Sequence, residues 1–192
     1  AKASMKADVR IGVLLVAAAG LAVLAWGLWI PAKAFLAQHL MQAAWQRTID
    51  GRVQQQPWPW ADITPVLQLT LPNQHQSFIV LDNVSGEALA FGPGHVPTSG
   101  LPGVAGITVV GGHRDTHFSV LREIEPGDPV IVETSDGQQF RYAVRETAVR
   151  DYDDVQMNLR EGQHVLILAT CYPFDAMVPG GPERFIVIAD PI

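Results

Sequence analysis

"PVIVETSDGQQFRYAVRETAVR", Pro129 to Arg150, is the stretch that decides the fold class. Ser135 to Gln139 supplies turn-forming residues between two apolar runs. In the second run, Gln139 to Arg150, side chains of opposite character alternate along the chain: Phe140, Tyr142 and Val144 with Arg141 and Arg145. A period of two residues is typical of a β-strand with one face in a core and the other in water.

Runs of the same kind recur after Pro65, separated by turn residues. They read VLQLTL, SFIVLD, ALAFG, ITVVGG, PVIVET, QFRYAVRETAVR, HVLILAT and RFIVIA, which makes roughly eight strands. No strand alternates with a helix of comparable length, which argues against a doubly wound parallel sheet. The sequence therefore predicts a mostly antiparallel barrel or sandwich over residues 65–192. The long Gly and Pro loop from Phe91 to Gly106 is a candidate functional loop.

The composition excludes one class of partner and one class of bond. The formal net charge is -6, and the 13 Lys and Arg residues are scattered, so the basic patch of a nucleic-acid binder is missing. A single cysteine rules out an intramolecular disulfide without identifying the compartment.

A candidate membrane anchor precedes the strands. Ile11 to Ile30 is a run of twenty residues without a charge, long enough for a helix to span the ~30 Å hydrocarbon core. Trp26 and Trp29 suit the membrane interface. A cleaved signal peptide normally has a shorter apolar region, and a buried soluble helix normally has a polar stripe. We therefore expect an uncleaved transmembrane signal anchor over residues 11–30.

The flanking charges set the expected orientation. Lys2, Lys6 and Arg10 precede the anchor against one acid, Asp8. The positive-inside rule then keeps residues 1–10 cytoplasmic and everything after the anchor across the membrane.

Residues 31–64 connect the anchor to the strands. Ala32 to Asp50 has apolar residues at helical spacing, which predicts an amphipathic helix that docks on the β domain after it or lies along the membrane surface. Gln54 to Pro65, "QQQPWPWADITP", alternates prolines with Trp58 and Trp60 and is expected to be extended. We expect these tryptophans to clamp the linker onto the barrel rather than contact a substrate.

Cys171 follows the apolar run HVLILAT, so we expect its thiol near the rim of the fold rather than in the middle of the core. A lone cysteine is commonly a small buried apolar residue, and position alone favours that interpretation slightly. A nucleophilic role requires a group that favours the thiolate, usually a histidine close in space.

His113 is the candidate partner, because "ITVVGGHRDTHF" places it after a buried strand and two glycines, at a strand end like Cys171. His117 completes an H-x-x-x-H spacing that could bind a metal, but no HExxH glutamate is present and Asp115 is the only further ligand in view. Arg184 opens the last strand and is either an oxyanion donor at the same rim or a surface salt-bridge residue. The other histidines are expected to be surface or turn residues: His39, His75, His95 and His164.

Together these residues resemble the sortase family of membrane-anchored cysteine transpeptidases, over nearly the whole chain from Ile30 to Ala189. The resemblance rests on the anchor, on "GGHRDTHF", on "LATCYP" and on "ERFIV". "GHRDTHF", with "IPAKAFLAQ", "WPWADITPV" and "LAFGPGH", looks most like the sortases of Gram-negative proteobacteria. The family implies a closed, mainly antiparallel eight-stranded β-barrel with short helices.

The resemblance also implies a reaction and its residues. Sortases cleave an LPxTG-like sorting signal near the C-terminus of an exported protein, hold the acyl fragment as a thioester and transfer it to an amine. The implied roles are Cys171 as nucleophile, His113 as general acid and base, Arg184 as the donor that orients substrate and supports the oxyanion, and Thr170 as a residue lining the substrate groove. Leu168 and Ala169 precede Thr170 where many sortases have threonine and leucine, which would alter the groove rather than the chemistry.

The expected partners are an exported protein with such a signal, an amine acceptor that the sequence does not identify, and the cytoplasmic membrane, with the catalytic domain on its extracytoplasmic side. No metal or cofactor is expected. Two alternatives stay open: a membrane-bound cysteine endopeptidase that uses water as acceptor, and a non-catalytic envelope protein that binds peptide tails.

Overall fold

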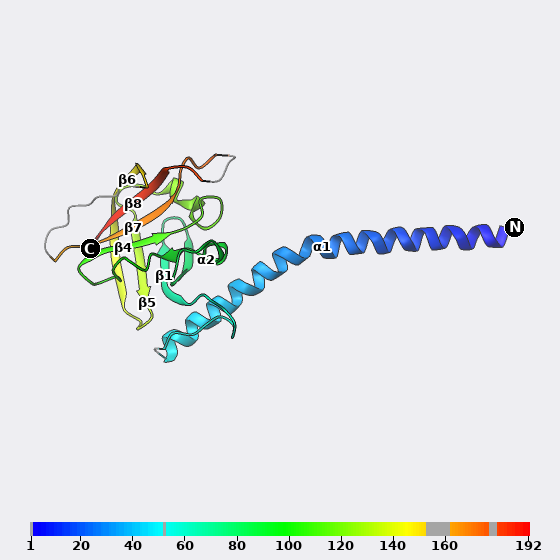
Figure 1. Ribbon diagram of the computed structural model, residues 1–192, viewed down its shortest axis with the longest axis horizontal. Helices are drawn as coiled ribbons and strands as arrows, with labels where there is room; N and C mark the ends of the chain where they lie inside the picture. The colour runs from blue at the N-terminus through cyan, green and yellow to red at the C-terminus, as the bar shows by residue number, and fades with distance from the viewer. Residues whose placement is uncertain (1, 52, 153–161, 177–179) are drawn as a thin grey trace. The chain divides into compact units, whose positions relative to one another are not determined.

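The computed structural model describes residues 2–51, 53–152, 162–176 and 180–192. The chain forms two compact units, Ala1–His39 and Leu40–Ile192. Its helices are α1 (Lys2–Gly51), α2 (Gly86–Phe91) and the 3₁₀ helix η1 (His117–Glu123). Its strands are β1 (Pro65–Leu71), β2 (Gln76–Leu81), β3 (Gly94–His95), β4 (Gly106–Gly111), β5 (Pro129–Thr134), β6 (Gln139–Asp151), β7 (His164–Cys171) and β8 (Glu183–Pro191) (Figure 1).

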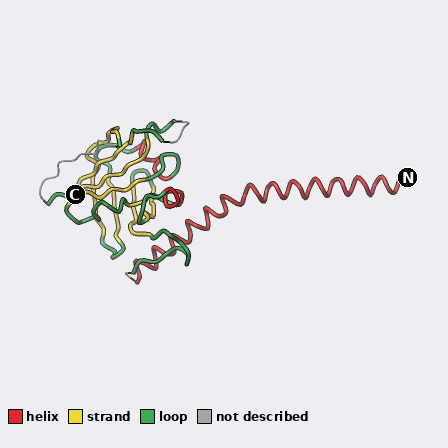
Figure 2. The backbone as a smooth tube through the Cα atoms, viewed as in Figure 1, coloured by secondary structure: helices red, strands yellow, loops and turns green. Residues whose placement is uncertain are grey.

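The strands close into a barrel in the order β1-β2-β3-β4-β7-β8-β6-β5. Two of the neighbouring pairs, β2 with β3 and β4 with β7, are parallel, and the others are antiparallel. Figure 2 shows the strands gathered in the larger unit, with short helical segments beside them. The predicted mainly antiparallel, closed eight-stranded barrel is confirmed.

The alternating pattern of β6 is confirmed as well. Tyr142 and Val144 are buried in the barrel core, whereas Arg141 and Arg145 are exposed. Strand β1 alternates in the same way, because successive side chains of a strand face opposite sides. Its buried side chains belong to the same core cluster as those of β6. The largest apolar cluster accordingly fills the barrel interior.

One of the eight predicted strands is wrong. The run "ALAFG" lies in helix α2, because Ser85 caps the helix by accepting a hydrogen bond from the backbone N–H of Ala88 at 3.1 Å, and Glu87 adds a favourable negative charge in the first turn. The eighth strand is instead the two-residue β3, which pairs with Leu81 of β2 on one side and with β4 on the other.

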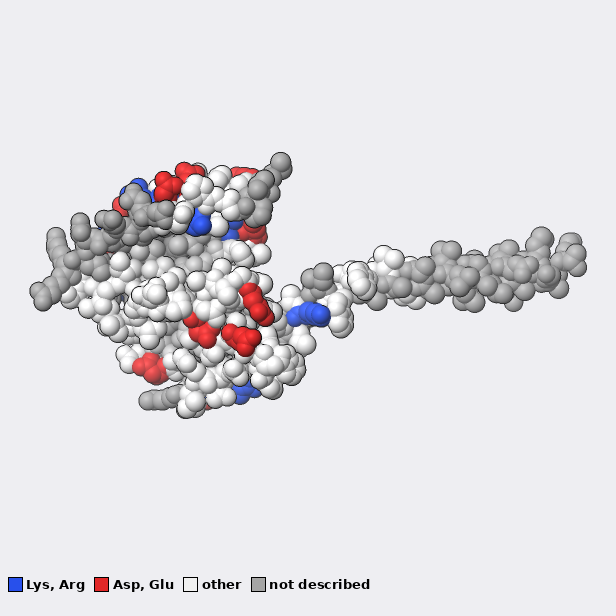
Figure 3. Space-filling view, viewed as in Figure 1, with Lys and Arg blue, Asp and Glu red and all other residues white. Residues whose placement is uncertain are grey.

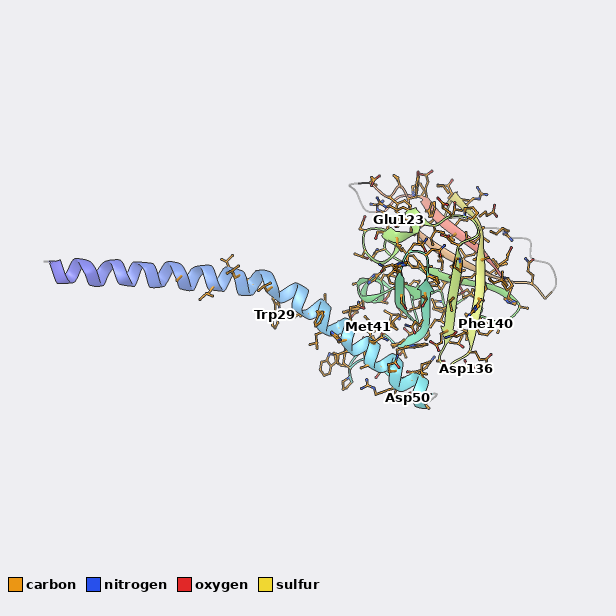
Figure 4. The ribbon with its side chains drawn as sticks, turned by 180° about the vertical axis from the view of Figure 1, so that it is seen from behind. Trp29, Met41, Asp50, Glu123, Asp136 and Phe140 are labelled. Carbon is orange, nitrogen blue, oxygen red and sulfur yellow. The ribbon has the colours of Figure 1, made fainter. Side chains whose placement is uncertain are left out.

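The end of α1 docks on the barrel, which is one of the two arrangements predicted for the amphipathic segment. Met41 and Trp45 are fully buried against the linker and the β2–α2 region, and Met41 projects from α1 in Figure 4. The Trp45 indole N–H donates to Oε1 of Gln68 in β1 at 3.1 Å. The linker tryptophans behave differently: Trp58 packs edge-on against Phe91 at 5.5 Å, whereas Trp60 is 80% exposed.

Trp45→Ala is expected to lower the free energy of unfolding by about 3 to 5 kcal/mol, because it removes a fully buried aromatic side chain and leaves a cavity between helix and barrel. Urea unfolding would measure the change. The neighbouring exposed position offers a matched control, Gln46→Ala, which should change stability by less than about 0.5 kcal/mol. Equal stability of the two variants would contradict the docking.

The predicted membrane anchor, Ile11 to Ile30, lies within α1, but many of its side chains are outside the described ones. Among the described residues, no helix has the length and apolar character needed to cross a membrane. The anchor therefore stays a prediction, as does the cytoplasmic assignment of residues 1–10.

Charged side chains are scattered over the larger unit. On the face drawn in Figure 3, acidic and basic groups both appear at several places, and the described residues form no continuous basic patch there.

Candidate active site

Strand β7 presents two different faces. Leu166 and Leu168 point into the barrel core, while Ile167 and Ala169 belong to a second cluster on the outer face of β4, β7 and β8. Cys171 follows Ala169 with the same period of two, so it lies on the outer face as well. It is half-buried and is the last residue of the strand. The expected position of the thiol at a rim is therefore correct.

An open groove of about 1060 Å³ runs over this outer face. Its apolar floor comes from adjacent strands and consists of Ile107, Val109, Ile167, Ala169 and Ile186. Residues of α2 and of the Phe91 to Gly106 loop add further walls: Leu89, Val96, Thr98, Ser99 and Gly100. The groove therefore offers an extended apolar surface, and the long Gly and Pro loop contributes to it.

Strand directions bring the candidate catalytic residues to one end of the groove. Strands β4 and β7 are parallel, so His113, two residues beyond β4, lies at the same edge as Cys171. Strand β8 is antiparallel to β7, and Arg184 is the direct register partner of Cys171. All three residues line the groove.

Thr170 and Gly112 connect the end of β7, which carries Cys171, to the segment after β4, which carries His113. The Thr170 hydroxyl is buried and donates to the carbonyl oxygen of Gly112 at 2.7 Å, while the Gly112 N–H donates to the Ala169 carbonyl at 3.1 Å. A Cβ at Gly112 would lie 2.7 Å from the Phe118 ring. The backbone at Gly112, directly before His113, is thus fixed by hydrogen bonds to β7 and by close packing against Phe118. Thr170 lines the groove, and its hydroxyl is already hydrogen-bonded to Gly112.

Arg184 is half-buried beside Cys171. Its Nη1 donates to the carbonyl oxygens of Gly181 and Glu183 at 2.6 and 2.9 Å, and its guanidinium carbon lies 5.9 Å from the centre of the Tyr152 ring. Among the described residues it has no carboxylate within salt-bridge distance. Arg184 also lines the groove, and a guanidinium is a group that can donate to a developing oxyanion.

His117 lies apart from this groove. It begins η1, its ring meets Phe78 edge-on at 6.1 Å, and it lines a separate cavity of about 420 Å³. The described residues contain no group of three or more His, Cys, Asp or Glu that could hold a metal ion. The H-x-x-x-H spacing therefore finds no further ligands in the described part of the chain.

His117→Gln tests a pH effect on stability. Burial, and secondly the neighbouring His113, lower the pKa of His117 from its ordinary value of 6.5. The unfolded chain then binds more protons than the folded protein below about pH 6.5, so stability falls as the pH drops. The variant should lose less Tm than the parent between about pH 7.5 and 5, whereas Gln46→Ala, which removes no titratable group, should not change the slope. An unchanged slope in His117→Gln would refute this.

The prediction that His95 is a surface or turn residue is wrong. His95 is buried in β3, where Nε2 lies 3.0 Å from the Gly100 carbonyl and 3.1 Å from the Ser99 hydroxyl. It therefore holds the loop that walls the groove. His39 and His75 are exposed as expected, and His164 is half-buried at the start of β7.

Arg114, which sequence reasoning did not single out, is also buried beside the site. It follows His113, and its guanidinium donates to backbone carbonyls in the segment that follows Cys171. No local pattern indicates such a role, because its partners are distant in sequence.

The model of the sortase domain family matches residues 69–192, which is most of the chain. The chain belongs to the sortase family. Sortases are extracytoplasmic, membrane-associated cysteine transpeptidases that act on exported proteins with sorting signals. The matched region includes Cys171, His113, Arg184 and Thr170.

One curated relative is similar in sequence to this chain, and several solved structures are similar in fold. The chain is 34% identical over 120 residues to Sortase D of Bacillus subtilis, covering 62% of this chain and 60% of that protein, so it spans less than two thirds of this relative's length. Sortase C-1 of Actinomyces oris matches with a TM-score of 0.59 at 25% identity, over 68% of this chain and 76% of that one. Sortase A of Corynebacterium diphtheriae, a lid mutant, matches with a TM-score of 0.62 at 19% identity, over 84% and 95%.

The sortase relative from Bacillus subtilis bears on the subclass. Bacillus is Gram-positive, so this sortase does not support the predicted membership in the class of Gram-negative proteobacteria. The family assignment does not depend on that subclass.

Proposed function

We propose that this chain is a sortase transpeptidase that cleaves an LPxTG-like C-terminal sorting signal and transfers the acyl fragment to an amine. One observation carries the proposal: Cys171, His113 and Arg184 line the same end of an apolar groove on the outside of the barrel. A groove of this kind suits an extended peptide, whose apolar side chains would lie on Ile107, Ile167 and their neighbours.

The proposed reaction has two acyl transfers. The Cys171 thiolate attacks the scissile carbonyl, a C–S bond forms, and the C–N bond breaks as His113 protonates the leaving amine. In the second transfer His113 takes a proton from the incoming amine, a new C–N bond forms, and the C–S bond of the thioester breaks. The Arg184 guanidinium orients the substrate and stabilises the negative charge on the carbonyl oxygen in both steps. Thr170 lines the groove beside the thioester.

The proposed location is the cytoplasmic membrane, with Ile11 to Ile30 as a single-pass anchor and the barrel on the extracytoplasmic side. The apolar run and its flanking positive charges support this location. The full chain should remain with the membrane fraction after washing at alkaline pH, and a chain lacking residues 1–30 should not. Release of both chains would contradict the anchor.

Product composition tests the proposed reaction. The enzyme is incubated with an LPxTG-like peptide, with and without a primary amine such as triglycine. The products are separated by chromatography and identified by mass spectrometry. We expect a new amide between the acyl fragment and the added amine. If only the hydrolysed acid forms at any amine concentration, the chain acts as an endopeptidase and transpeptidation is the wrong description.

A further inference from the structure

Two segments flank the candidate active site. The first joins β4 to η1 and carries His113, and the second follows Cys171 at the end of β7 and leads toward Arg184. Arg114 links them. Its side chain is only 5% exposed, its Nη1 donates to the Pro173 carbonyl at 2.8 Å, and its Nη2 donates to the Ala176 carbonyl at 2.8 Å.

The geometry uses the fork shape of a guanidinium. Pro173 and Ala176 are the two ends of one turn, since the Ala176 N–H points back to the Pro173 carbonyl at 3.3 Å. Two N–H groups on separate nitrogens of Arg114 reach both ends of this turn, so they set its orientation as well as its distance. A lysine ammonium is a point charge and does not reproduce this fork. Nε of Arg114 donates to Asp115 at 3.2 Å, which offsets the cost of burying the cation.

The turn is in contact with the β8 end of the site. Phe174, inside the turn, packs against Phe185 with ring centres 5.2 Å apart, and Phe185 is the neighbour of Arg184. The Tyr172 N–H donates to the Glu183 carbonyl at 3.1 Å. A displacement of the turn would therefore move Cys171 and Arg184 relative to His113.

Arg122 is a second arginine that contacts the same turn, so it offers a matched comparison with Arg114. It is exposed, its guanidinium lies 5.2 Å from the centre of the Phe174 ring, and it is 3.7 Å from the Asp175 carboxylate. Exposed ion pairs contribute little to stability. Arg122 therefore touches the same turn as Arg114 without the buried pair of hydrogen bonds.

We propose that Arg114 is a positioning residue, which holds the turn after Cys171 against the strand end that carries His113 and so sets the mutual geometry of Cys171, His113 and Arg184. This inference rests on the proposed function. Arg114 is not among the residues that line the groove, so it acts through the two backbone carbonyls and not through substrate.

The test compares Arg114→Met, Arg114→Lys and the control Arg122→Met, with every rate expressed per folded enzyme. Small misplacements of reacting groups cost up to roughly 100-fold in rate, so we expect Arg114→Met to lower kcat by about 10- to 100-fold with little change in KM. Arg114→Lys should fall between Met and the parent, and Arg122→Met should stay within about 2-fold of the parent. Adding guanidinium ion to Arg114→Ala should restore part of kcat, whereas ammonium ion at equal ionic strength should not.

A second measurement separates this inference from the proposed function. The rate of alkylation of Cys171 by iodoacetamide is followed against pH in the parent, Arg114→Met and Arg122→Met, and it needs no turnover. A changed profile in Arg114→Met alone supports the positioning role even if the parent makes no amide product. The positioning role is overturned if Arg114→Met changes neither the pH profile of alkylation nor kcat. It is also overturned if the unfolded fraction of the variant accounts for the whole loss in kcat and guanidinium ion restores none of it. If Arg114→Met does not fold, the Lys variant decides by the same criteria.

Discussion

Cys171→Ala is expected to remove cleavage and transfer of an LPxTG-like peptide, with a loss in kcat on the order of 10⁴-fold or more. The reason is that the proposed reaction proceeds through a C–S bond that alanine cannot form. Chromatography of the peptide products would measure the loss. Cys171 is half-buried at a strand end, so removing one sulfur should leave the barrel folded.

The single cysteine makes this experiment unambiguous. Titration of free thiols should find one per chain in the parent and none in the variant. Cys171→Ser retains a hydroxyl at the same place and should also be nearly inactive, because a serine hydroxyl is far less acidic than a thiol and a much weaker nucleophile than a thiolate. Activity within tenfold of the parent in the alanine variant would remove Cys171 from the mechanism.

His113→Ala is expected to lower kcat/KM by roughly 10²- to 10⁴-fold, the range for the loss of a general acid and base. In the proposed reaction His113 protonates the leaving amine and then deprotonates the incoming one, so both transfers slow. Steady-state rates with a peptide and an amine would measure the effect. The exposed side chain and the engaged backbone of His113 suggest that the fold tolerates the change.

His117 provides the matched control, because it lies four residues away on η1 and lines the other cavity. His117→Ala should reduce kcat/KM by less than about tenfold, since no proton transfer is assigned to it. If the two alanine variants lose activity equally, or if His117→Ala loses more, the assignment of the acid and base to His113 is wrong.

The barrel could be predicted largely from local patterns. The alternation around Tyr142 and the apolar run before Cys171 identify β6 and β7 because side chains on a strand alternate between two environments. Local patterns failed at Ala88 to Gly92, where an apolar run was taken for a strand although Ser85 caps a short helix. They also missed β3, whose two residues form a strand only through their pairing with β4 and β2.

Some residues of the candidate site could likewise be predicted from the sequence, and others could not. Cys171, His113 and Arg184 stand at strand ends that the sequence marks, so their common edge could be predicted once the strands were recognised. Arg114 could not, because its carbonyl partners lie 59 and 62 residues further along the chain and carry no side-chain signature. His95 was misjudged for a related reason, since its burial depends on the fold of the loop around Gly100.

The mass of the intact enzyme during turnover tests the central claim most directly. Parent enzyme mixed with an excess of LPxTG-like peptide, without an added amine, should gain the mass of the acyl fragment on its one cysteine. Hydroxylamine should remove the adduct, as expected for a thioester, and Cys171→Ala should never acquire it. Peptide cleavage by the parent without any such adduct under rapid quenching, or an adduct on the alanine variant, would contradict a thioester at Cys171.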